Sequence, residues 1–230
     1  MDFLIVVNLL ELASAIVGTF YITKYRVDSI TRYFVYFLWL TALVEIIFGW
    51  IPWFIYYYES LSYYKNTWLV SNHWIYNTYF VISFIFYTVY FLFYIKTKLV
   101  KFFLILFIIV YFLSSVYVYI STEIFFSNIS IFTYVLGSIM ISLSILWYSY
   151  EILKGDKILN FYRNLSSYVA FGALSFHLLV TPIFIYGKYY SDENPEFVSI
   201  RTIILYGANI FLYTCYILGF ILCYRKNRFG

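Results

Sequence analysis

The chain has 230 residues, of which 64% are hydrophobic and 11% charged, and its formal net charge is +4. A soluble domain carries about 25% charged residues, so a water-soluble fold of this composition would expose large apolar patches. The composition therefore excludes a soluble protein and indicates one whose solvent is the lipid bilayer. Its basic residues report membrane topology rather than nucleic-acid binding.

The first apolar segment covers about residues 3–23 and contains Glu11. A secretory signal peptide has a basic leader and an uninterrupted apolar core. Neither is present, so we expect this segment to be a retained transmembrane helix. Within it Asn8, Glu11 and Ala15 follow helical spacing, which predicts a polar, small-residue face turned toward other helices.

Six further apolar segments are long enough to cross a hydrocarbon core of about 30 Å, which takes roughly 20 helical residues. They cover about residues 33–57, 73–95, 101–121, 129–152, 166–187 and 200–224. Their short connections predict that sequential helices pack as antiparallel neighbours, and the alternating pattern of a membrane β-barrel is absent. The sequence therefore predicts an all-α fold, with residues 1–230 forming a single domain of seven transmembrane helices.

Polar side chains at membrane depth are costly and by default mark function. Five of them come from five different segments at overlapping depths: Glu11, Glu45, Asn77, His177 and Asn209. Helical rise places Glu11 about 10 Å from the start of its helix and Glu45 about 20 Å from the opposite face. Both carboxylates therefore belong to the same half of the bilayer. We predict that the five side chains face the bundle interior and line a ligand-binding pocket.

Each of these residues also has a structural interpretation. A buried glutamate, histidine or asparagine can serve only to hold helices together through hydrogen bonds. Pro182 is expected to kink the sixth helix, where neighbouring helices can satisfy the freed backbone groups. The sequence alone does not separate a pocket from such packing contacts.

Lys and Arg residues alternate between the connections and indicate the orientation. Of the fifteen basic residues, only Lys65, Lys188 and Arg201 lie on the side of the N-terminus. The other twelve share the opposite side: Lys24, Arg26, Arg32, Lys96, Lys98, Lys101, Lys154, Lys157, Arg163, Arg225, Lys226 and Arg228. The positive-inside rule then predicts an external N-terminus and a cytoplasmic C-terminus. We expect the plasma membrane, in a bacterium the inner membrane.

Seven helices with an external N-terminus are shared with rhodopsins and G-protein-coupled receptors, a resemblance of topology only. A retinal protein needs a Schiff-base lysine in the last helix, and residues 200–224 contain none. The third helix ends at Tyr94 without the acidic-Arg-Tyr motif of receptors. Seven-helix zinc hydrolases of ceramides rely on several histidines, whereas this chain has only His73 and His177. The sequence therefore indicates none of these families.

Three functions fit these observations. The favoured one is a non-enzymatic sensor, receptor-like unit or membrane-complex subunit that binds a small-molecule or lipid ligand in an outward-facing pocket. Its cytoplasmic connections have only about ten residues, so it would signal through a separate membrane or cytoplasmic protein. The first alternative is a lipid-modifying enzyme that uses Glu11, Glu45 and His177 as metal ligands or as general acid and base. The second is an ion-coupled transporter, against which the lack of an evident internal repeat argues. No catalytic site, metal site or cofactor is predicted.

Overall fold

The computed structural model describes residues 2–155, 161–187 and 195–229 of the chain, with the backbone alone described at residues 2, 3, 66 and 224–229. Most of these residues are helical, and none of them forms a β-strand. The α-helices are α1 (Asp2–Lys24), α2 (Ser29–Leu43), α3 (Ile51–Tyr57), α4 (His73–Tyr94), α5 (Lys98–Ser121), α6 (Ile124–Ser127), α7 (Ile131–Lys154), α8 (Leu165–Ile185) and α9 (Pro195–Phe229). A π-helical turn, η1 (Val44–Phe48), follows α2, and two 3₁₀ helices, η2 (Glu59–Asn66) and η3 (Trp68–Val70), precede α4.

Seven helices in the described part of the chain are long and apolar enough to cross a membrane. They are α1, the combined α2–η1–α3 segment, α4, α5, α7, α8 and α9. The prediction of an all-helical chain with seven helices of this kind is therefore confirmed. The structure moves some boundaries: α2 begins at Ser29 because the Asp28 carboxylate accepts a hydrogen bond from the Thr31 amide at 3.0 Å and caps the helix.

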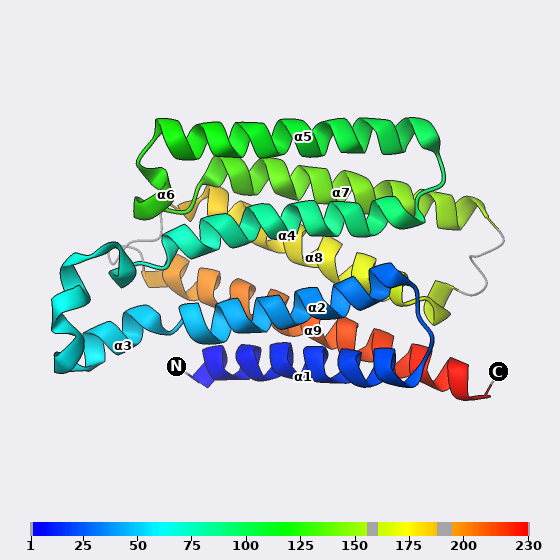
Figure 1. Cartoon of the computed structure of the whole chain (residues 1–230), viewed down its shortest axis with the longest axis horizontal. Coiled ribbons are helices and arrows are strands. Elements are labelled where there is room, and N and C mark those ends of the chain that lie inside the picture. Colours follow the sequence, from blue (N-terminus) through cyan, green and yellow to red (C-terminus); the bar gives the residue numbers. More distant parts are fainter. Residues whose placement is uncertain (1, 156–160, 188–194, 230) are drawn as a thin grey trace.

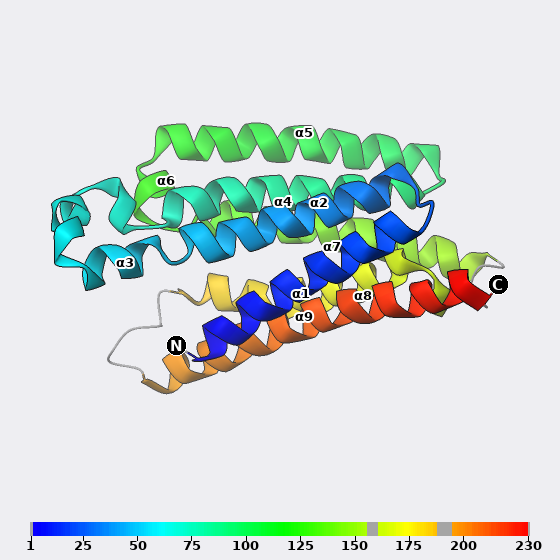
Figure 2. The ribbon, with the colours of Figure 1, turned by 60° about the horizontal axis from the view of Figure 1, so that its bottom comes forward.

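The helices form one elongated bundle (Figures 1 and 2). Six of them form a ring in which each helix contacts the next, in the order α1, α2, α4, α7, α8 and α9, and α9 contacts α1. Helix α5 lies outside this ring against α4 and α7. In the apolar 18-residue stretch of α5 only 17% of the residues are buried inside the bundle, compared with 50% in that of α7. The expected packing of sequential helices is present, and the ring adds two pairs that the sequence did not indicate, α4 with α7 and α1 with α9.

The N-terminus and the C-terminus lie at opposite ends of the bundle (Figure 1). We refer to these as the N-terminal end and the C-terminal end. The connections from α1 to α2 and from α4 to α5 lie at the C-terminal end, as do the last turn of α7 and the first turn of α8, and α3, η2, η3 and α6 lie at the N-terminal end. The connections with most of the basic residues are thus on one side of the molecule; Lys157 and Lys188 lie outside the described residues.

The bundle interior is filled mainly by aromatic rings. The largest fully buried side chains include Tyr90, Tyr111, Tyr134, Tyr216, Phe34, Phe84, Phe91 and Phe220. Two interior tyrosines bond directly to each other, with 2.6 Å between the hydroxyls of Tyr87 and Tyr216. Discrete cavities remain between the helices, and two of them are lined by residues predicted from the sequence.

Candidate functional site

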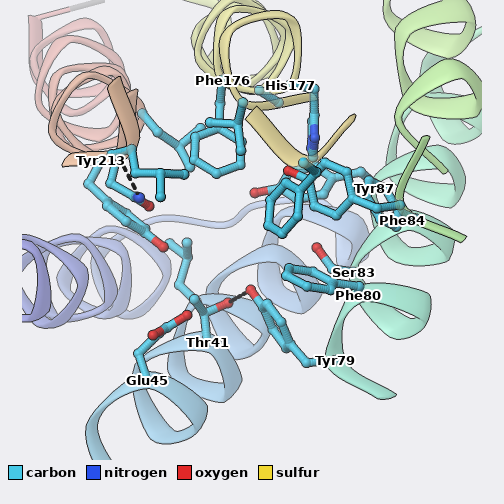
Figure 3. Close-up of a pocket in the computed structure, with 18 residues that line it drawn as sticks. Thr41, Glu45, Tyr79, Phe80, Ser83, Phe84, Tyr87, Phe176, His177 and Tyr213 are labelled. Atoms are coloured by element: carbon cyan, nitrogen blue, oxygen red, sulfur yellow. Dashed lines mark hydrogen bonds between the residues drawn. The ribbon is translucent and has the colours of Figure 1, made fainter. Parts of the chain in front are cut away.

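A central cavity of about 150 Å³ lies between α2, η1, α4, α7, α8 and α9. Its lining residues are Leu38, Thr41, Glu45, Tyr79, Phe80, Ser83, Phe84, Tyr87, Tyr134, Ala173, Phe176, His177, Val180, Phe184, Leu205, Asn209, Leu212 and Tyr213. In Figure 3, Glu45 lies on one side of this cavity together with Thr41, and His177 lies on the opposite side beside Phe176. The cavity thus has polar groups on two walls and aromatic rings between them.

An end cavity of about 340 Å³ adjoins the central one on the side of the N-terminal end. It is bounded by α1, η1 and α9, and its lining residues are Leu4, Val7, Glu11, Glu45, Val198, Arg201, Thr202, Leu205, Tyr206 and Asn209. Three residues, Glu45, Leu205 and Asn209, line both cavities. They lie where the two spaces border each other, and we refer to this place as the junction. Four of the five side chains predicted from the sequence therefore belong to one pair of adjoining cavities.

Glu45 reaches the junction from a distorted part of its helix. It lies in the π-helical turn η1, where the Gly49 amide donates to the Val44 carbonyl at 3.1 Å instead of to the carbonyl four residues back. Such π turns occur frequently at functional sites, because the extra residue changes the direction of a side chain. The Tyr76 hydroxyl of α4 donates to Glu45 Oε2 at 2.7 Å and holds the carboxylate in place.

Gly49 permits this arrangement because it has no side chain. A Cβ atom at this position would lie 2.3 Å from the Glu45 carbonyl oxygen and 3.1 Å from the Tyr76 hydroxyl oxygen. The first distance is shorter than any real carbon–oxygen contact of this kind. The turn, the carboxylate and the tyrosine hydroxyl consequently fit together only around a glycine.

Glu11 occupies the neighbouring wall of the end cavity. Its side chain is 1% exposed, and Oε2 has no hydrogen-bond partner. Its electrostatic neighbours are the Glu45 carboxylate and the Tyr213 hydroxyl. In the described part of the chain no Lys or Arg contributes to the environment of either carboxyl group, even though Arg201 lines the same cavity. Among the described residues the two carboxyl groups therefore share one site, with Arg201 on the wall of the same cavity.

His177 lies at the far wall of the central cavity within a set of aromatic rings. Its ring centroid is 5.2 Å from those of Phe84 and Phe176 and 6.3 Å from that of Tyr134. The side chain is 6% exposed, and Nδ1 has no hydrogen-bond partner. A buried polar atom without a partner costs free energy, so an occupant of the cavity that bonds to this nitrogen would remove that cost.

Hydroxyl and amide groups complete the polar lining. The Thr41 hydroxyl donates to the Phe37 carbonyl at 3.0 Å, so the 2.8 Å bond between Thr41 and Tyr79 has the Tyr79 hydroxyl as donor. The Asn209 side-chain amide donates back to the Leu205 carbonyl at 2.8 Å, and its own carbonyl oxygen remains available at the junction. These bonds fix which groups can accept a hydrogen bond from an occupant.

Asn77 has a different position from the other four. Its Nδ2 donates to the Phe125 carbonyl at 3.0 Å and to the Asn128 carbonyl at 2.9 Å, and its Oδ1 accepts from the Ser130 amide at 3.1 Å. All three partners belong to the connection between α5 and α7. The side chain lines neither of the two cavities described above and instead holds this connection against α4.

Sequence reasoning missed several residues of the site. Tyr76 was not singled out, although its hydroxyl reaches inward to Glu45. Tyr79 and Arg201 were not singled out, although both line a cavity. A signal existed: Tyr76, Tyr79, Ser83 and Tyr87 recur at helical spacing along α4. In a segment so rich in aromatic residues, however, that polar stripe is easily read as part of an aromatic pattern.

The catalytic alternative required Glu11, Glu45 and His177 to converge on one point. No group of three or more His, Cys, Asp or Glu side chains with metal-binding geometry occurs in the described residues. Glu11 lines only the end cavity and His177 only the central cavity, with Glu45 between them at the junction. The three side chains therefore lie along the two cavities in sequence and do not surround a common centre.

Comparisons of the chain with protein-family models, with curated proteins and with solved structures gave no significant match. A proposal about function therefore rests on the geometry of the two cavities and on the charge distribution along the chain.

Proposed function

We propose that this protein binds a small ligand from outside the cell, in the joined central and end cavities. The single observation that carries the proposal is that Glu45, Leu205 and Asn209 line both cavities. A largely apolar pocket with a few converging polar groups is the usual form of a small-molecule site. The unpartnered atoms of Glu11 and His177 supply such groups at its two extremes.

The outward orientation of the site follows from the charges. Most basic residues belong to the connections at the C-terminal end, and the positive-inside rule assigns that end to the cytoplasm. The end cavity is lined by the first halves of α1 and α9 and therefore faces the exterior. We place the protein in the plasma membrane, in a bacterium the inner membrane, with the N-terminus outside.

The binding proposal accounts for the geometry better than the two alternatives. A lipid-modifying enzyme would need its acid, base or metal ligands around one reacting atom, and Glu11, Glu45 and His177 are instead spread over two cavities. An ion-coupled transporter commonly has discontinuous helices in corresponding positions of two repeats, whereas η1 interrupts a single helix. Since the connections at the C-terminal end are short, a ligand signal would pass to a separate membrane or cytoplasmic protein.

Cysteine labelling tests whether the cavity opens to the exterior. In a Cys215→Ser, Cys223→Ser background, Leu205→Cys places a thiol at the junction of the two cavities. We expect a membrane-impermeant, cationic methanethiosulfonate reagent added to intact cells to modify this thiol, because the reagent can enter the end cavity from outside. Modification is measured as the loss of later labelling by a fluorescent maleimide after the protein is denatured.

Two control variants give the labelling rates expected for a thiol shielded by lipid and for a thiol exposed to water. Leu9→Cys lies on the exposed face of α1, where the native leucine is 60% exposed on the outside of the bundle, and lipid should shield it. Tyr63→Cys in η2, where the native side chain is 82% exposed, should react at once. If Leu205→Cys reacts no faster than Leu9→Cys while Tyr63→Cys is modified, the cavity does not open outward and the proposal fails.

A further inference from the structure

The two carboxyl groups of the site lie in surroundings that favour a positively charged occupant. Glu11 and Glu45 are electrostatic neighbours, and no basic side chain of the described residues contributes to the environment of either. A buried charge needs a partner of opposite sign or a proton to neutralise it. A cation at the junction would contact the Glu45 carboxyl group and lie within reach of Glu11, whose Oε2 is buried without a partner.

The aromatic wall of the central cavity supports the same sign of charge. The rings of Phe80, Phe84, Tyr87 and Phe176 line the same cavity as Glu45 (Figure 3), and Tyr134 is a further aromatic residue of its lining. The face of an aromatic ring carries negative electrostatic potential and attracts cations, most strongly where water is excluded. An anionic occupant of the central cavity would instead meet the Glu45 carboxyl group and these rings.

The dimensions limit the size of the occupant. A buried cavity of about 150 Å³ is known to take a ligand the size of benzene, and the central cavity has this volume. The end cavity is larger and contains Arg201, which lines only that space and not the junction. A compact cation can therefore place its charge at Glu45 and its apolar part among the rings.

We propose that the joined cavities bind a small organic cation, an ammonium group carried on a body about the size of a single ring. The ammonium group lies at the junction between Glu45 and Glu11, and the body enters the central cavity toward His177. The His177 nitrogen without a partner can bond to a polar substituent at the far end of the body. This assignment rests on the proposed function, because the ligand must reach the cavities from outside.

Competition with the thiol reagent tests the charge requirement. Benzylamine, which is a cation at neutral pH, and benzyl alcohol have nearly the same shape and differ in charge. At ten times its Kd a competing ligand leaves about a tenth of the sites open, so we expect saturating benzylamine to slow modification of Leu205→Cys roughly tenfold. Benzyl alcohol and the anion benzoate at the same concentration should leave the rate unchanged, as should benzylamine acting on Tyr63→Cys.

Glutamine variants identify the groups that recognise the cation. Adding Glu45→Gln or Glu11→Gln to Leu205→Cys should abolish the protection by benzylamine. The reagent is itself a cation, so these variants should also be modified more slowly, and protection is therefore measured within each variant as the ratio of the rates without and with benzylamine. Glu59→Gln, at an exposed carboxylate of η2, should keep full protection. The comparison of benzylamine with benzyl alcohol needs neither variant of the site, so it decides the question even where a glutamine variant does not fold.

The failures of the two proposals are distinguishable. If Leu205→Cys is modified from outside but benzylamine does not slow the reaction, or benzyl alcohol slows it equally, the cavity is open and the assignment of a cation is wrong. If Leu205→Cys is not modified at all, the outward-facing cavity itself is wrong, and the cation assignment falls with it. Retention of protection in both glutamine variants would also overturn the assignment.

Discussion

Asn77 and Glu45 are both polar residues at membrane depth, yet their surroundings differ. Each hydrogen-bonding group of the Asn77 amide is used by the backbone of the α5–α7 connection. Glu45 has one tyrosine partner and otherwise faces two cavities. We therefore expect a change at Asn77 to affect folding, and a conservative change at Glu45 to affect what the cavities bind.

Replacing Asn77 by leucine should destabilise the protein. The change keeps a similar volume but leaves the carbonyls of Phe125 and Asn128 and the amide of Ser130 without their partner. An unsatisfied buried polar group costs about 1–3 kcal/mol, so we expect a loss on the order of 3 kcal/mol in the free energy of unfolding. Denaturation by SDS in lipid bicelles measures this quantity.

Thr78→Ala is the matched control for Asn77. Thr78 is exposed, and its hydroxyl bonds only to the Trp74 carbonyl of its own helix at 2.9 Å. Its removal should change the free energy of unfolding by less than about 0.5 kcal/mol. Equal stability of the Asn77 and Thr78 variants would show that the α5–α7 connection does not depend on the amide.

For single residues, the sequence could indicate which side chains face the bundle interior, but it could not indicate their hydrogen-bond partners. The cost of a polar group in lipid is enough to turn Glu11, Glu45, Asn77 and His177 toward the bundle interior, and all four are buried or line an interior cavity. Their partners depend on side chains and connections distant in sequence. The Asn77 amide, for example, bonds to residues about fifty positions later.

The second membrane-crossing segment combines an ordinary α-helix, a π turn and a short helix. α2 ends at Leu43, η1 covers Val44–Phe48, and α3 resumes at Ile51. The hydrophobicity of residues 33–57 predicts one continuous helix, because apolar periodicity responds to length and not to a single extra residue in a turn. The π turn depends on the tertiary bond between Tyr76 and Glu45 and on the missing Cβ at Gly49.

Gly49→Ala should disturb this segment in a way that ordinary helix propensity does not predict. Alanine favours helices over glycine by about 1 kcal/mol, but its Cβ would approach the Glu45 carbonyl within 2.3 Å. We expect a net loss of about 1–3 kcal/mol in the free energy of unfolding, which is typical of overpacked positions. SDS titration in bicelles measures it.

Gly207→Ala is the corresponding control, because a Cβ at Gly207 would meet no atom within 4 Å. Here the helix propensity should act alone, and the variant should be as stable as the native chain or more stable by up to about 1 kcal/mol. If both alanine variants gained stability, the π turn would not require a glycine at position 49.

The architecture of the whole molecule was easier to predict from the sequence than the contacts of single residues. Seven apolar segments of sufficient length predicted seven membrane-crossing helices, and the alternation of Lys and Arg between the connections checked this number independently. The ring order and the position of α5 outside it were not visible, because an apolar helix facing lipid and one facing other helices have similar composition. The two cavities lie inside that ring, so their existence could not be read from any single segment.

The orientation of the molecule has its own test. In the background without native cysteines, Tyr63→Cys should react with an impermeant thiol reagent added to intact cells, and Lys96→Cys, in the connection from α4 to α5, should react only after the membrane is permeabilised. The positive-inside rule gives the physical reason, since the basic connections remain in the cytoplasm. The opposite pattern would place the C-terminal end outside and turn the end cavity toward the cytoplasm.

Helix α9 is uninterrupted from Pro195 to Phe229, and its first half lines both cavities. Leu205 at the junction and Cys223 near the C-terminal end are eighteen residues apart on one helix, a distance of about 27 Å. A regular helix with no proline beyond its first residue is stiff over that length. Helix α9 is therefore expected to move as one rigid rod. A tilt of α9 at the cavities would displace its opposite end, because no loop within the helix can absorb the movement.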